Sequence, residues 1–136
     1  MKRYEIIAHV ADIRLSVEGS TMPELFNAAL EGMAEIITPQ QCTPPFNKQI
    51  ELSVASVDAT TLLIDFLSDV LTQTHLTKAL YCKAEFTELS EKKLQAKLYG
   101  NMVKSFDEDI KAVTYHEADV KKNGRGNFQT IIIFDI

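Results

Sequence analysis

The chain has 136 residues, of which 46% are hydrophobic and 24% charged, and this composition is typical of one globular domain, not of a disordered or fibrous chain. With 14 basic and 19 acidic residues the formal net charge is −5, so we do not expect strong, direct nucleic-acid binding by the whole surface. The sequence contains no apolar run of about 20 residues, and we therefore expect a cytoplasmic protein without a membrane partner.

The N-terminal part has the pattern of two β-strands. The first covers residues 4–10 and the second covers residues 13–18, where apolar Ile13, Leu15 and Val17 alternate with polar side chains. This period of two is typical of strands with one buried face.

A helix is predicted after the second strand. Thr21 and Glu24 have the spacing of a capping box, and Pro23 lies in the first turn, where proline is favoured. Apolar residues then recur every three or four positions as far as Ile37, which predicts an amphipathic helix.

The middle of the chain contains a loop, a strand and a second helix. The prolines in residues 38–45 favour a loop, and apolar residues alternate with polar ones over residues 50–55. Asp58 is a favourable N-cap for a second amphipathic helix that ends near His75.

The rest of the chain is predicted to be rich in β-structure. Residues 80–86 and 94–99 have the pattern of a hairpin, and a further strand is expected over residues 110–120. A glycine-rich turn over residues 122–127 leads into a last strand over residues 128–136.

These elements predict an α+β sandwich that forms a single domain over residues 1–136. We expect a mostly antiparallel or mixed sheet with both amphipathic helices packed on one of its faces. The two cysteines, Cys42 and Cys82, show neither a CxxC motif nor zinc-finger spacing, so we expect two small buried thiols without a disulfide or structural zinc.

Carboxylates stand at the ends of two predicted strands. Asp12 lies in the corner that begins with His9, and Asp135 and the terminal carboxylate of Ile136 follow a long apolar strand. If these strand ends lie side by side, the three negative charges require a cation, and oxygen ligands favour Ca²⁺ or Mg²⁺, with Mn²⁺ as a further candidate. The alternatives are a turn-capping Asp12 and a solvated chain end.

Lys111 is the candidate for a contact with an anion. If residues 110–117 form a strand, Lys111 and Tyr115 share one face and His116 lies on the other. Lys111 could then bind a phosphate or a partner's carboxylate, whereas the alternative is an ordinary solvated face. The chain has no GxSxG, HExxH or Walker motif, so pattern alone does not indicate an enzyme.

Four motifs together resemble the archease family, the small activator proteins of RtcB-type RNA ligases. The resemblance covers essentially the whole chain in order, spacing and length, and it is carried by His9-Val10-Ala11-Asp12-Ile13, Thr21-Met22-Pro23-Glu24-Leu25-Phe26, Lys111-Ala112-Val113-Thr114-Tyr115-His116 and Ile133-Phe134-Asp135-Ile136. It implies a non-enzymatic protein cofactor that promotes GTP-dependent guanylylation of the ligase histidine and multiple turnover in tRNA splicing or RNA repair.

The resemblance also implies roles for individual residues. A divalent metal site maps onto Asp12, Asp135 and Ile136, and activation of the partner maps onto Lys111 together with the two aspartates. His9 and His116 could contact the metal ligands without binding the metal themselves. The chain departs from the family pattern at four positions, which are Ala8, Val10, Arg14 and Phe128.

Two other functions remain open. A small metal-dependent hydrolase would use His9, Asp12, His116 and Asp135 as mixed nitrogen and oxygen ligands. A metal-free interaction module would instead dock its N-terminal half, which carries the acidic excess, on a basic partner.

Overall fold

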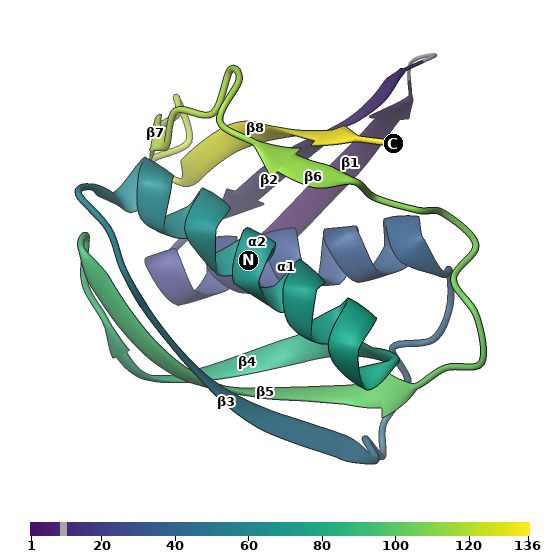
Figure 1. Ribbon diagram of the computed structural model, residues 1–136. Helices are drawn as coiled ribbons and strands as arrows, with labels where there is room; N and C mark the ends of the chain where they lie inside the picture. The colour runs from purple at the N-terminus through teal and green to yellow at the C-terminus, as the bar shows by residue number, and fades with distance from the viewer. Residues whose placement is uncertain (9–10) are drawn as a thin grey trace.

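The structure is a computed structural model that describes residues 1–8 and 11–136, and these residues form two helices between two antiparallel sheets (Figure 1). The first sheet has the order β1 (Lys2–Ala8), β2 (Asp12–Gly19), β8 (Phe128–Asp135) and β6 (Ala112–Thr114), and β7 (Lys121–Lys122) also pairs with β8. The second sheet has the order β3 (Lys48–Ala55), β5 (Lys93–Met102) and β4 (Ala79–Leu89). The helices are α1 (Met22–Ile37) and α2 (Ala59–Thr77).

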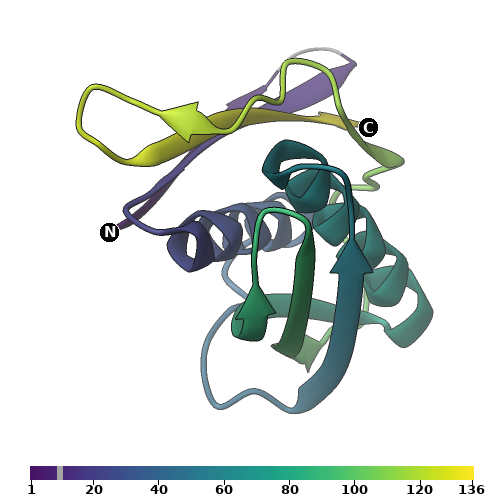
Figure 2. The same cartoon turned by 90° about the vertical axis from the view of Figure 1, so that its left-hand side faces the viewer.

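The α+β class and the two packed helices are confirmed, but the expected single sheet with both helices on one face is wrong. Helix α1 contacts β1 and β2 on one side and β4 on the other, so the helices form a middle layer (Figure 2). The reason lies in α1, where ten of 16 residues are buried. That many buried residues occupy more than one stripe, and a single sheet cannot cover them all.

Both predicted helix starts are confirmed. The side chain of Thr21 accepts a hydrogen bond from the backbone N–H of Glu24, and Asp58 accepts one from Thr61. Helix α2 ends at Thr77, slightly later than predicted, where Lys78 adopts a left-handed conformation with φ of 58°. Within the described residues, neither helix has the length and apolar character needed to cross a membrane.

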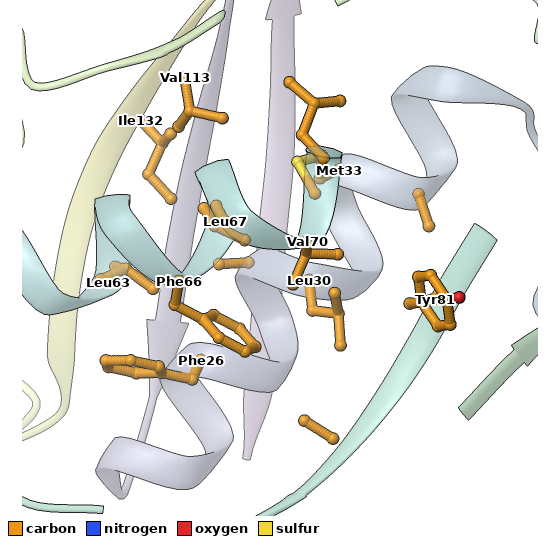
Figure 3. Packing of buried hydrophobic residues seen from close by; sticks show 14 of the residues in the cluster. Phe26, Leu30, Met33, Leu63, Phe66, Leu67, Val70, Tyr81, Val113 and Ile132 are labelled. Atoms are coloured by element: carbon orange, nitrogen blue, oxygen red, sulfur yellow. The ribbon is translucent and has the colours of Figure 1, made fainter. Parts of the chain in front are cut away.

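The core lies between the sheets and joins all three layers. Phe26 of α1, Phe66 of α2 and Phe86 of β4 pack with ring centroids 5.6 to 5.9 Å apart. From the other sheet, Val113 of β6 and Ile132 of β8 point into the same cluster (Figure 3). The burial of Val113 holds the short strand β6 against the body of the protein.

The predicted strand over residues 110–120 is wrong beyond its first few residues. Within residues 110–120, only Ala112–Thr114 pairs with β8. The chain then turns, because Glu117 has a left-handed φ of 61° and the N–H of Ala118 donates to the carbonyl of Tyr115. The expected alternation of faces therefore does not extend to Tyr115 and His116, which are both exposed.

The prediction of two buried free thiols is also wrong, because Cys42 and Cys82 form a disulfide with their Cα atoms 5.5 Å apart. The loop after α1 returns to β4, and the pairing of β4 with β5 shifts register between Tyr81 and Lys83. Cys82 is the extra residue of this bulge. Spacing along the chain contains no information about such a long-range approach.

The predicted glycine-rich turn is confirmed, with Gly126 at a φ of 76°, and a buried glutamate fixes it to the sheet. Glu18 is only 3% exposed and accepts hydrogen bonds from Arg125 (2.7 and 3.0 Å), Asn123 (2.7 Å) and Asn127 (2.9 Å). These bonds, that of Arg125 first, lower the pKa of Glu18 from 4.5 to about 2.

The close packing of β5 against β4 predicts that Gly100→Ala is strongly destabilising. A Cβ atom at Gly100 would lie 1.9 Å from the carbonyl oxygen of Leu80, which is backbone and cannot rotate away. We expect urea unfolding to show a loss of about 1–3 kcal/mol. Gly124→Ala is the matched control, since no atom lies within 4 Å of its Cβ position, and it should change stability by less than about 0.5 kcal/mol. Equal stabilities of the two variants would contradict the packing.

The Glu18 cluster predicts a pH-dependent contribution to stability. Because the pKa of Glu18 is about 2 in the folded protein and 4.5 ordinarily, its contribution is complete above pH 4.5 and is lost as the pH falls towards 2. We expect Glu18→Gln to lower the melting temperature at pH 7, and the difference from the wild type to shrink steadily between pH 5 and pH 2. A difference independent of pH would show that the carboxylate charge is not what holds the turn.

Candidate functional site

Three strands bring the candidate residues to one end of the first sheet (Figure 1). Strand β2 begins at Asp12 and β8 ends at Asp135, and these two residues are direct cross-strand partners. Strand β6 begins beside them, because Ala112 is also a partner of Asp135. The N–H of Lys111 donates to the carbonyl of Asp135 at 2.8 Å. Positions 12, 111 and 135 of the sequence thus meet at one sheet edge.

The two aspartates share the outer face of this sheet, away from the helices. Their neighbours Ile13 and Phe134 are buried in the core, so strand alternation turns Asp12 and Asp135 outward. Direct partners on one face have Cβ atoms about 4.5–5.5 Å apart. Two carboxylates this close repel each other unless a cation lies between them.

The environments of the two aspartates differ. Asp135 is exposed, while Asp12 is half-buried and its Oδ1 atom is buried without a hydrogen-bond partner in the described part of the chain. Neither carboxylate forms an ion pair within residues 1–8 and 11–136. Ile136 follows directly and packs partly against the core. This sheet edge therefore presents carboxylate oxygens that can still accept a cation.

An ion pair fixes the turn that follows β6. Arg14, on the same face of β2 as Asp12, pairs with Glu117. Between β2 and β6 lies Ile133 of β8, which is paired with both Arg14 and Thr114. Ile133 is only 6% exposed although it faces outward, which fits a turn that folds back over the sheet. Arg14 therefore helps to fix this turn.

A second anchor joins the same turn to helix α2. The hydroxyl of Tyr115 donates to Asp65, which also accepts a hydrogen bond of 2.6 Å from the hydroxyl of Ser56. The bond to Asp65 raises the pKa of Tyr115, because loss of the phenolic proton would place two negative charges together. Lys111 and Tyr115 are both exposed, but they flank β6 and do not share a strand face as predicted.

Of the two histidine candidates, the structure describes only His116. His116 is exposed in the turn beyond β6, and His9 lies outside the residues that the structure describes. Over residues 1–8 and 11–136, no group of three or more His, Cys, Asp or Glu side chains is placed to hold a metal. A cation at Asp12 and Asp135 would thus need a further ligand, such as a main-chain oxygen of Ile136.

Two anchoring pairs were absent from the sequence prediction. The partners in Arg14–Glu117 are 103 residues apart, and those in Tyr115–Asp65 are 50 residues apart. No local pattern marks such pairs. The short carboxylate motifs, in contrast, stand at strand ends, and the pairing of those strands is what brings them together.

Comparisons with known proteins give a consistent result. Residues 4–136 match the archease protein family (MTH1598/TM1083). The protein archease of Methanosarcina mazei is 28% identical over 144 aligned positions, and the alignment covers 99% of this chain and 97% of that protein.

Two solved structures have the same fold. Protein 1598 of Methanobacterium thermoautotrophicum has a TM-score of 0.79 and 21% identity, over 98% of each chain. An archease of Thermotoga maritima, described as a possible chaperone, has a TM-score of 0.64 and 19% identity, over 97% of this chain and 96% of the other. At these identities the likeness is evidence for the fold alone.

The Tyr115–Asp65 bond predicts that Asp65→Asn lowers the pKa of Tyr115 towards its ordinary value of 10.0, because the amide carries no charge. NMR titration of tyrosine ring carbons measures this shift, with Tyr99 as an internal control, since its hydrogen bond to Glu85 is unaffected by the substitution. An unchanged titration of Tyr115 would show that the turn is not anchored at Asp65.

Proposed function

The chain belongs to the archease family, and we propose that it acts in the cytoplasm as a non-enzymatic activator of an RtcB-type RNA ligase. It promotes GTP-dependent guanylylation of the ligase histidine and allows repeated turnover in tRNA splicing or RNA repair. The observation that carries the proposal is the pairing of Asp12 with Asp135 beside Lys111, because this edge unites the residues to which the family resemblance assigns activation.

The donor atoms at this edge fit a hard divalent cation. Asp12 offers a buried oxygen that has no partner among residues 1–8 and 11–136, Asp135 offers a carboxylate opposite to it, and Ile136 offers a main-chain oxygen. Oxygen ligands of this kind suit Ca²⁺, Mg²⁺ or Mn²⁺ better than zinc. When bound, the ion supplies positive charge that neutralises the two carboxylates and nearby phosphate oxygens.

Lys111 and its neighbours supply the contact with the ligase. The side chain of Lys111 is exposed, and its backbone is fixed to β8 by the bond to Asp135. An exposed ammonium can bind an anionic group of the ligase or the GTP triphosphate. The Arg14–Glu117 and Tyr115–Asp65 pairs hold the following turn, so this surface is preorganised for docking.

Catalysis belongs to the ligase in this proposal, and strong direct binding of RNA by the activator is not part of it. The chain's contribution is to bind and orient, through Asp12, Lys111 and Asp135, a partner that carries the reacting histidine. No contact among the described residues favours the alternative hydrolase, whose His116 lies in the turn beyond the edge.

The proposal predicts separate effects for Asp135→Asn and Lys111→Met. Asp135→Asn should abolish both the stimulation of ligase guanylylation and the rise in melting temperature on adding Ca²⁺ or Mg²⁺, because one ligand charge is lost. Lys111→Met should abolish stimulation and keep the metal-dependent rise.

Asp119→Asn is the matched control, since the exposed carboxylate of Asp119 pairs with Lys121, and the backbone N–H of Asp119 donates to the hydroxyl of Thr130, away from the edge. It should behave as the wild type in both assays. Full stimulation by Asp135→Asn would refute the metal-binding edge, and full stimulation by Lys111→Met would refute the role of Lys111.

A further inference from the structure

The disulfide between Cys42 and Cys82 borders the surface. Both cysteines line a hollow of about 520 Å³, together with Asn27, Phe46 and Lys83. Cys42 is half-buried and Cys82 is 6% exposed. Because the hollow opens to solvent beside both residues, a small thiol can approach the sulfur of Cys42 without unfolding of the core.

The disulfide is one of several contacts that hold the loop before β3. Residues 38–47 contain no helix or strand. The side-chain amide of Asn101 donates to the carbonyls of Gln41 (2.9 Å) and Thr43 (3.2 Å). At the far end, the N–H of Asn47 donates to the carbonyl of Gly100 at 3.1 Å. These exposed bonds persist without the disulfide, but they leave the loop more mobile.

Strand β4 is also held without the disulfide. Asn27 of α1 accepts a hydrogen bond from the N–H of Ala84 at 2.8 Å and donates one to its carbonyl at 3.0 Å, which closes part of the free edge of β4. Leu80 and Tyr81, just before the bulge, are buried in the core. Opening of the disulfide should therefore affect the loop and not the sheet.

From this arrangement we infer that Cys42–Cys82 is a reversible thiol–disulfide site, at which a dithiol reductant releases the loop of residues 38–47 while the core stays folded. A disulfide that reaches the surface on one side is more readily reduced than one enclosed in a core. The site is separate from the sheet edge of Asp12 and Asp135, and it does not depend on the function proposed for that edge.

The exchange proceeds in two steps. A thiolate of the reductant attacks the sulfur of Cys42, the more exposed of the two, and the sulfur of Cys82 leaves as a thiolate and takes up a proton. The second thiolate of the reductant then attacks the mixed disulfide and releases Cys42, which is protonated in turn. Two electrons and two protons pass to the protein, and the reductant becomes a disulfide.

Redox titration of the full chain tests the inference, with dithiothreitol as the reductant and alkylation followed by mass spectrometry as the readout. We expect complete reduction under native conditions and full reoxidation when oxidised dithiothreitol is added. Reduction only at the rate of global unfolding, measured in parallel in urea, would overturn the inference. A chain that unfolds once it is reduced would overturn it equally.

Backbone dynamics then test what the disulfide holds. The ¹⁵N order parameters of Gln41, Thr43 and Phe46 should fall in the reduced chain, while those of α1 and β5 keep their values. The Cys42→Ser/Cys82→Ser variant should match the reduced chain in either redox buffer. If these order parameters are equal in the oxidised chain, the reduced chain and this variant, the disulfide does not control the loop and the inference fails.

Discussion

The antiparallel register of β2 and β8 is the constraint on which the site depends. Burial of Ile13 and Leu15 on one strand, and of Ile132 and Phe134 on the other, fixes which residues face the helices. A slip of one residue would turn every side chain of a strand to the opposite face. The alternation that builds the core therefore also turns Asp12 and Asp135 outward and sets them opposite each other.

Much of the fold could be predicted because its signals are local. The alternation in β2, the caps at Thr21 and Asp58 and the turn before β8 each depend on residues close together in the sequence. The sequence also placed Asp12 and Asp135 at strand ends, which left their convergence as one of the open alternatives. Only the pairing of those strands had to be assumed, and it occurs.

Other features depend on contacts that no local pattern records. Division of the strands into two sheets follows from burial on two sides of α1, and the early end of β6 follows from the turn at Glu117 and its ion pair with Arg14. The Cys42–Cys82 disulfide forms because a bulge in β4 meets a returning loop. In each case the stabilising contacts join residues far apart in the chain, so a prediction from local spacing was wrong.

The most direct test of the proposed activator role is the rate of ligase guanylylation and RNA joining with the wild-type chain at substoichiometric amounts. The RtcB-type ligase of the same organism is the enzyme to use, with GTP and a divalent cation present. The proposal predicts strong stimulation, with each molecule of the activator serving many molecules of ligase. A competent ligase whose rate and turnover are unchanged by the added protein would contradict it.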